Sequence, residues 1–192
     1  MIKKTILNHS PIIAIVTLII SCAFIGDKLT LLLRFEREAI LSGELYRLLT
    51  AHFVHLNWMH ALMNVAATII GWCLLRDSMT KRQWILSIAI SGLVVSVLLF
   101  SLPELEWYVG FSGIIHGLML QGLILQKHLR FIEKTLMVSA LFLKVFYELW
   151  QGSSTADLEF IDGNIIVEAH LFGLLAGLIM IICIKTMAFY RQ

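Results

Sequence analysis

The sequence predicts an all-α membrane protein, a single-domain bundle of six transmembrane helices over residues 1–192 with both termini in the cytoplasm. Three observations lead to this fold class. First, 59% of the residues are hydrophobic and 15% are charged, whereas a soluble domain contains about 45–50% apolar residues. Second, apolar runs recur along the chain without a Gly/Ser-rich linker or an internal repeat between them. Third, Lys and Arg are concentrated in every second segment between the runs, as expected for the cytoplasmic segments of a membrane protein.

Six apolar runs supply the candidate helices. They lie at residues 11–26, 56–75, 84–102, 113–127, 134–150 and 165–184. A bilayer core about 30 Å thick needs roughly 20 apolar helical residues, so several runs are short, which suits helices whose ends are buried in protein. The first run follows Lys3 and Lys4, as in a signal peptide, but Ser21-Cys22-Ala23 is a poor cleavage site. We therefore expect the first run to remain as a helix.

The positions of Lys and Arg predict the orientation. With the N-terminus in the cytoplasm, the turns around Glu104 and Asp157 lie outside and contain no Lys or Arg, as the positive-inside rule requires. The first outside segment, residues 27–50, is an exception because it mixes basic residues with leucines. We expect it to form an interfacial helix. The small net charge of +2 and the absence of a basic patch interleaved with aromatic residues argue against a nucleic-acid partner.

Polar residues within the apolar runs or at their starts mark the candidate site. An ionisable side chain in hydrocarbon costs about 2–3 kcal/mol or more, so each one needs a partner or a function. On the predicted topology these residues gather toward the outside face. They are His55, His60, Asn64, Ser112, His116, Lys144, Glu148, Glu168 and His170.

Ser112 lies in Gly110-Phe111-Ser112-Gly113, where an acidic outside turn becomes an apolar helix. Free backbone N–H groups at a helix start can bind a developing oxyanion, which would suit a nucleophilic serine. The same residues also fit a helix-capping serine with glycines for a tight turn.

His170 precedes Gly173 and Gly177, a G-x-x-x-G spacing that lets another helix approach closely. The histidine can therefore contact a neighbouring helix, either as a general base or through a simple interhelical hydrogen bond.

His60 and Asn64 are four residues apart and so share one helix face, with His55 near the outer mouth. Such a pair of polar groups could hold an oxyanion or a metal ion. A zinc site needs three or four convergent ligands, and the H-E-x-x-H pattern is absent. We expect no metal and no other cofactor.

Taken together, these motifs resemble those of the rhomboid intramembrane serine proteases. H-x-x-x-x-H-x-x-x-N at 55–64, G-x-S-G at 110–113 and A-H-x-x-G-x-x-x-G at 169–177 occur in the order of that family and on the corresponding spans. Residues 46–58, 113–117 and 168–171 look most like the rhombosortase branch. The similarity runs from about residue 44 to the end of the sixth span, and the first span matches by position alone.

The resemblance implies a rhomboid-like bundle and a serine–histidine dyad. Ser112 would attack the scissile carbonyl, and His170 would take its proton and return it to the leaving amine. His60 and Asn64, with the backbone N–H of Ser112, would form the oxyanion hole. Gly110 and Gly113 would leave room for the substrate backbone.

Two residues depart from the family pattern. His116 stands where many rhomboids have an aromatic residue packed on the base, so it would either stack on His170 or compete with it. We favour His170, because a base on a facing helix approaches the hydroxyl more freely. Glu168 should point away from His170 by helix geometry and pair with Lys144, which could also reach Glu148 through an i,i+4 contact.

The functional hypothesis is an endopeptidase of the bacterial inner membrane whose active site opens to the periplasm. As a rhombosortase-like protease it would cleave Gly-Gly-type membrane anchors at the C-termini of exported proteins. The anchor would enter beside the fifth span, and loop 151–164 would act as a lid. An inactive rhomboid-like chaperone and a small proton-coupled transporter are alternatives, and the sequence does not fix the oligomeric state.

Overall fold

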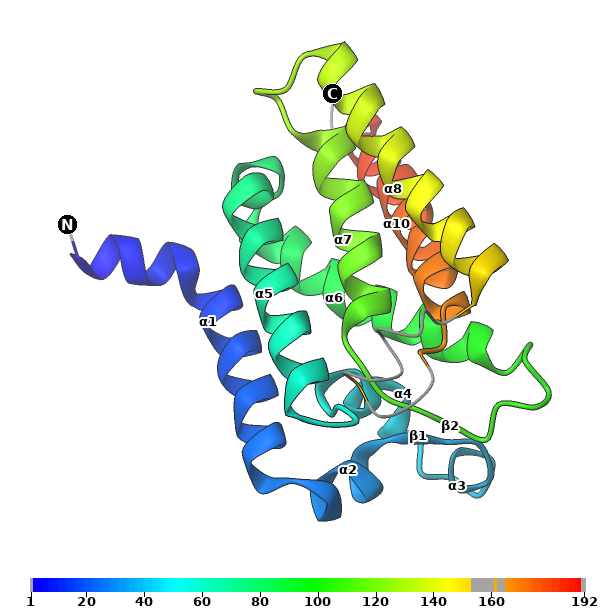
Figure 1. The fold of residues 1–192 in the computed structure, drawn as a ribbon. Coiled ribbons are helices and arrows are strands. Elements are labelled where there is room, and N and C mark those ends of the chain that lie inside the picture. Colours follow the sequence, from blue (N-terminus) through cyan, green and yellow to red (C-terminus); the bar gives the residue numbers. More distant parts are fainter. Residues whose placement is uncertain (1, 153–160, 162–164, 191–192) are drawn as a thin grey trace.

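The computed structural model describes residues 2–152, 161 and 165–190, and its long helices form a bundle around a central helix, α7 (Figure 1). Each predicted apolar run corresponds to one of these helices. The six are α1 (Ile2–Ile25), α5 (Trp58–Leu75), α6 (Lys81–Leu99), α7 (Ser112–Leu125), α8 (Phe131–Gln151) and α10 (Glu168–Phe189).

The described helices differ in whether they could cross a membrane alone. By length and composition three qualify, namely Trp58–Ser78 (α5 with its extension), α6 and the Glu168–Met187 part of α10. The Ser10–Ile25 part of α1 and helix α2 (Asp27–Leu33) qualify together as a pair bent by 117°. Helix α7 has 14 residues and is too short. The described structure therefore supports three or four spans, and the six predicted spans and their orientation stay predictions.

The segment 27–50, predicted as interfacial helix, is divided into several short elements. After α2 come β1 (Phe35–Glu36), α3 (Arg37–Leu41), α4 (Arg47–Thr50) and the 3-10 helix η1 (Ala51–Phe53). The prediction of helix is correct for much of the segment, and its interfacial location stays a prediction. Strand β1 pairs antiparallel with β2 (Trp107–Tyr108), and the fully buried ring of Phe35 lies opposite Tyr108. This pairing ties the segment to the turn that leads into α7.

The basic residues of this segment have structural partners. The guanidinium of Arg37 donates to the carbonyl oxygens of Leu102 at 2.6 Å and Leu105 at 2.9 Å, in the turn after α6. Arg34 pairs with Glu36, and Arg47 pairs with Glu44. These contacts explain why Arg is found on the predicted outside face, because each guanidinium satisfies carbonyl or carboxylate oxygens of the folded segment.

Helix α7 is the centre of the bundle, with ten of its 14 residues buried. It packs backbone to backbone against α10 through what we call the glycine contact, which consists of Gly113, Gly117, Gly173 and Gly177. A Cβ on Gly117 would lie 2.7 Å from the carbonyl oxygen of Gly173, and one on Gly177 would lie 2.8 Å from that of Gly117. The close approach predicted from the G-x-x-x-G spacing is confirmed, and its partner is α7.

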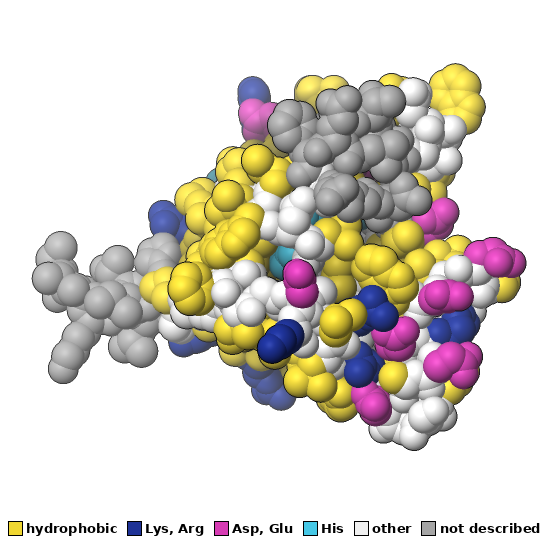
Figure 2. Space-filling view, turned by 60° about the horizontal axis from the view of Figure 1, so that its bottom comes forward, with side chains coloured by type: hydrophobic (Ala, Val, Ile, Leu, Met, Phe, Trp, Pro, Cys, Tyr) yellow, Lys and Arg dark blue, Asp and Glu magenta, His cyan; other side chains and the backbone are white. Residues whose placement is uncertain are grey.

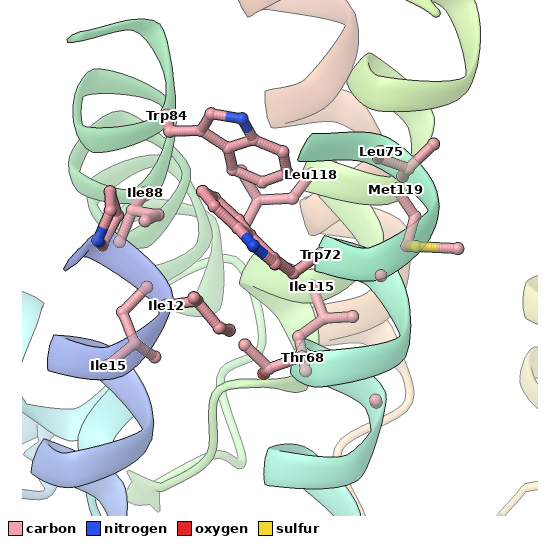
Figure 3. A pocket seen from close by; sticks show the side chains of 13 residues that line it. Ile12, Ile15, Thr68, Trp72, Leu75, Trp84, Ile88, Ile115, Leu118 and Met119 are labelled. Atoms are coloured by element: carbon pink, nitrogen blue, oxygen red, sulfur yellow. The ribbon is translucent and has the colours of Figure 1, made fainter. Parts of the chain in front are cut away.

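Two tryptophans, Trp72 of α5 and Trp84 of α6, pack against each other elsewhere in the bundle. The rings of Trp72 and Trp84 lie 5.2 Å apart between centroids, at 52° to each other. Figure 3 shows them beside a small apolar pocket that Ile12 and Ile15 of α1 also line. Helix α1 is thus attached to the bundle by apolar packing.

Candidate active site

Ser112 begins helix α7, and its side chain is not used to cap the helix. The capping position is Phe111, without a side-chain capping bond. Gly110 precedes it with φ of 125°, a left-handed conformation that favours glycine. A Cβ there would also lie 3.0 Å from the His60 ring. Gly110 therefore permits both the sharp turn into α7 and the close approach of His60.

His170 lies on α10 and faces Ser112. The distance from His170 Nε2 to Ser112 Oγ is 2.9 Å, although the two residues are 58 positions apart. His170 is buried, so its ring is fixed by protein neighbours. The structure thus brings together the hydroxyl and the imidazole that the sequence singled out.

A carboxylate completes a row of three groups. Glu148 Oε2, on α8, lies 2.9 Å from His170 Nδ1. The imidazole of His170 therefore stands between a hydroxyl and a carboxylate, the connectivity of a Ser-His-acid triad. Sequence reasoning expected a dyad and treated Glu148 only as a supporting residue. The available signal was a glutamate in an apolar run, four residues after a lysine.

His116 stacks on His170, with ring centroids 4.2 Å apart and planes inclined by 17°. Its Nδ1 lies 2.7 Å from the carbonyl oxygen of Ser112, and its Nε2 lies 2.8 Å from Lys144 Nζ. Of the two expected arrangements, the structure contains the stacked one. Both ring nitrogens are engaged with groups other than the Ser112 hydroxyl.

The predicted Lys144–Glu168 pair is wrong. Lys144 pairs instead with Glu148, at 2.8 Å between Nζ and Oε1, which is the predicted i,i+4 contact. Among the described residues, no ion pair joins Lys144 to Glu168. Two residues correspond to about 200° around a helix, so Glu168 faces away from the side of α10 that carries His170.

His60 and Asn64 line the same cavity as Ser112, a space of about 250 Å³ that His116, Lys144, Glu148 and His170 also border. The side chain of Asn57 accepts from the backbone N–H of His60 at 2.9 Å and so caps α5. Within the described residues, His60 Nδ1 and Asn64 Oδ1 are buried without a hydrogen-bond partner. Such polar atoms beside a cavity are available to a ligand.

His55 packs against the ring of His60, and its location near the outer mouth stays a prediction. The two rings meet edge to face with centroids 4.9 Å apart, and His55 is buried. Burial lowers the pKa of His55 to about 3, so its ring is neutral. Its role in the described structure is to support the ring of His60.

A second cavity, of about 340 Å³, reaches Ser112 from the β2 side and is bordered by Glu104 and Glu106. Figure 2 looks onto this face of the molecule and shows histidine within a hollow, with mainly hydrophobic side chains around it. The nucleophile candidate therefore lies between two cavities. Most of loop 151–164, predicted to be a lid, lies outside the described residues, but Ile161 and Ile165 line the 250 Å³ cavity.

The polar cluster also has the residue types of a metal site. Ligand atoms of His116, Glu148 and His170 all lie within 4.8 Å of one another. However, the ammonium of Lys144 is 2.8 Å from both His116 and Glu148. A metal ion would have to displace this ammonium, so the donor set fits the Lys144 ammonium better than a divalent cation.

Sequence reasoning missed His52, a fully buried residue of η1 that supports the turn before Ser112. Its Nε2 lies 2.9 Å from the carbonyl oxygen of Gly92 on α6, and its Nδ1 lies 3.3 Å from that of Gly110. Burial lowers the pKa of His52 to about 4. No spacing motif marks this residue, because its partners come from distant parts of the chain.

Comparison with known proteins identifies relatives of the chain. Residues 42–186 match the family model described as the rhomboid domain. The chain is 27% identical over 157 residues to "Putative rhomboid protease YdcA" of Bacillus subtilis (strain 168), covering 76% of this chain and 71% of that protein. It is 28% identical over 182 residues to "Rhomboid protease GlpG" of Salmonella typhi, covering 88% of this chain. The alignment spans only 59% of the length of GlpG.

Proposed function

The chain belongs to the rhomboid domain family, and on this premise we propose that it is an intramembrane serine endopeptidase with Ser112 as nucleophile and His170 as general base. The family match and the apolar helices make it a multi-pass membrane protein. The observation that carries the proposal is the 2.9 Å approach of Ser112 Oγ to His170 Nε2 beside a cavity. A hydroxyl bonded to a buried imidazole has the geometry of an activated nucleophile.

The reaction follows from these contacts. His170 Nε2 takes the Ser112 proton as Oγ bonds to the scissile carbonyl carbon, and the resulting imidazolium gives that proton to the leaving amine. Water then attacks the acyl carbon and loses a proton to His170, the ester bond to Ser112 Oγ breaks, and His170 returns the proton to Oγ as the acid leaves. Free N–H groups at the start of α7, with His60 and Asn64 bordering the cavity, are suited to stabilise the oxyanion.

The proposed substrates are bacterial inner-membrane proteins with a C-terminal Gly-Gly-type anchor, cleaved at the periplasmic side. This class rests on the residues that resemble rhombosortases. Gly110 and Gly113 are consistent with it, because an extended glycine backbone needs little lateral space. The site also lies beside Glu104 and Glu106, whereas Lys127 and Arg130 lie in the turn between α7 and α8, at the other end of α7. This distribution supports a periplasmic opening.

The decisive experiment follows processing of a tagged Gly-Gly-anchored reporter in membranes. Wild type should cleave it, and Ser112→Ala and His170→Ala should each lose roughly 10³-fold or more of the activity. Ser101→Ala and His128→Ala are matched controls, since both residues lie outside the site, and they should process normally. Equal processing by wild type and both site variants would contradict the protease proposal.

A further inference from the structure

The polar residues of the site form a closed ring of hydrogen bonds that begins and ends at Ser112. From its Oγ the ring runs to His170 Nε2, then from His170 Nδ1 to Glu148 Oε2. Glu148 Oε1 meets Lys144 Nζ, which also meets His116 Nε2. His116 Nδ1 returns to the carbonyl oxygen of Ser112. Three helices, α7, α8 and α10, contribute to this ring.

With Lys144 charged and His170 neutral, as a general base must be, the hydrogen bonds of the ring allow one arrangement of protons. The ammonium of Lys144 can only donate, so Glu148 Oε1 and His116 Nε2 must accept. His116 then carries its proton on Nδ1 and donates to the Ser112 carbonyl. The other carboxylate oxygen, Glu148 Oε2, also accepts, so His170 must carry its proton on Nδ1. His170 Nε2 is then the acceptor, and the Ser112 hydroxyl donates to it.

We propose that Glu148, oriented by Lys144, is a positioning residue that fixes the base-ready tautomer and the orientation of His170. The inference rests on the proposed function of Ser112 and His170, and it adds a carboxylate and a cation to the expected dyad. Glu148 also faces the imidazolium that forms during the reaction and stabilises its charge. Lys144 balances the carboxylate, which would otherwise be an uncompensated charge in a partly buried site.

The Lys144–Glu148 ion pair predicts that Glu148→Gln changes the tautomer of His170. Lys144 Nζ lies beside the side chain of residue 148 and can only donate, so it should bind the amide oxygen and turn the amide NH₂ toward His170 Nδ1. That nitrogen must then be an acceptor, which moves the proton to Nε2 and leaves His170 unable to accept from Ser112. A loss of activity of roughly 10²- to 10⁴-fold is expected, as for the wrong tautomer in other serine proteases.

A second substitution should relieve this defect. In Lys144→Met/Glu148→Gln the ammonium is absent, so the amide can turn its oxygen to His170 Nδ1 and restore the base-ready tautomer. The double variant should recover roughly tenfold or more of the activity lost by Glu148→Gln alone. A role of the pair in packing alone predicts the opposite, because two substitutions would then do at least as much damage as one.

The experiment uses the full chain in detergent micelles. The rate at which a fluorophosphonate probe labels Ser112 reports the reactivity of the nucleophile without a protein substrate, and the ¹⁵N NMR spectrum of His170 reports its tautomer. Glu133→Gln is the matched control on α8 and should leave both unchanged, because among the described residues Glu133 bonds to Arg130 at the start of that helix, away from the site. Labelling should also persist after EDTA treatment.

The outcomes separate the two proposals. A switch of the His170 proton from Nδ1 to Nε2 in Glu148→Gln, reversed in the double variant, supports the positioning role even if no reporter is cleaved. The same tautomer in wild type and Glu148→Gln would overturn the role while leaving the protease proposal intact. Loss of labelling with EDTA would also overturn it, since a metal rather than Lys144 would then organise the cluster.

Discussion

The two sides of the site are held by different forces. On one side, α7 and α10 meet through the glycine contact, where carbonyl oxygens lie against Cα atoms and no side chain fits between. On the other side, α8 has one buried residue, Val145, and reaches the site through Lys144 and Glu148. Backbone packing therefore sets the distance between Ser112 and His170, while hydrogen bonds place the carboxylate.

This difference suggests a division of tasks. A backbone contact resists small displacements, because any shift makes atoms overlap. It suits the pair of groups between which a proton must pass. Helix α8 packs on the bundle through Val145 and partly buried apolar side chains such as Leu141. A helix with so little buried surface can move more readily, which suits α8 because the substrate anchor is expected to enter beside it.

The largest effect is expected from breaking the glycine contact. In Gly173→Ala the new Cβ would overlap the carbonyl group of Gly113, so α7 and α10 must separate. We expect a loss of stability of about 3 kcal/mol and little remaining labelling of Ser112, as measured by thermal unfolding in detergent and by the fluorophosphonate probe.

Gly71→Ala on α5 is the matched control for this substitution. A Cβ there would lie 3.1 Å from the sulfur of Met119, the end of a flexible side chain that can move. Its stability should stay near that of wild type or rise slightly, because alanine favours helix over glycine by about 1 kcal/mol. Equal melting temperatures of Gly173→Ala and Gly71→Ala would show that the contact is not rigid.

A smaller effect concerns the support of the backbone before Ser112. Burial lowers the pKa of His52 from its ordinary value of 6.5 to about 4, so the folded chain keeps it neutral. The unfolded chain takes up a proton below pH 6.5, so this contribution to stability is present above pH 6.5 and is lost as the pH falls toward 4. The loss at pH 4 should reach about 3 kcal/mol.

Thermal unfolding of wild type and His52→Gln between pH 7 and pH 4 tests this expectation. The variant should be less stable at pH 7 but should lose less stability on acidification, since its amide does not take up a proton. Parallel pH profiles for the two proteins would assign the acid sensitivity to other groups.

The smallest effect is expected from weakening the link between α7 and α8. His116→Phe keeps an aromatic ring against His170 but removes the bonds to the Ser112 carbonyl and to Lys144. Labelling of Ser112 should fall roughly tenfold, equivalent to about 1.4 kcal/mol, with little change in melting temperature. Abolition of labelling, as expected for His170→Ala, would make His116 the base.

Much of the fold could be predicted because it follows from the hydrophobicity of contiguous segments of the sequence. The apolar runs correspond to the six long helices, and the spacing of Gly173 and Gly177 predicts a close contact between helices. The segment 27–50 could not be predicted in detail. Its division into short elements depends on the burial of Phe35 against the distant strand β2, and no local pattern encodes that pairing.

The sequence by itself determined the composition of a membrane bundle and the chemical types of the groups gathered near one face. Only the tertiary structure decided which groups meet, since hydrogen bonding depends on distances of a few ångströms between residues on different helices. It paired Lys144 with Glu148 instead of Glu168, and it stacked His116 on His170. A helical period fixes the face on which a side chain lies, but its neighbour depends on how the helices pack.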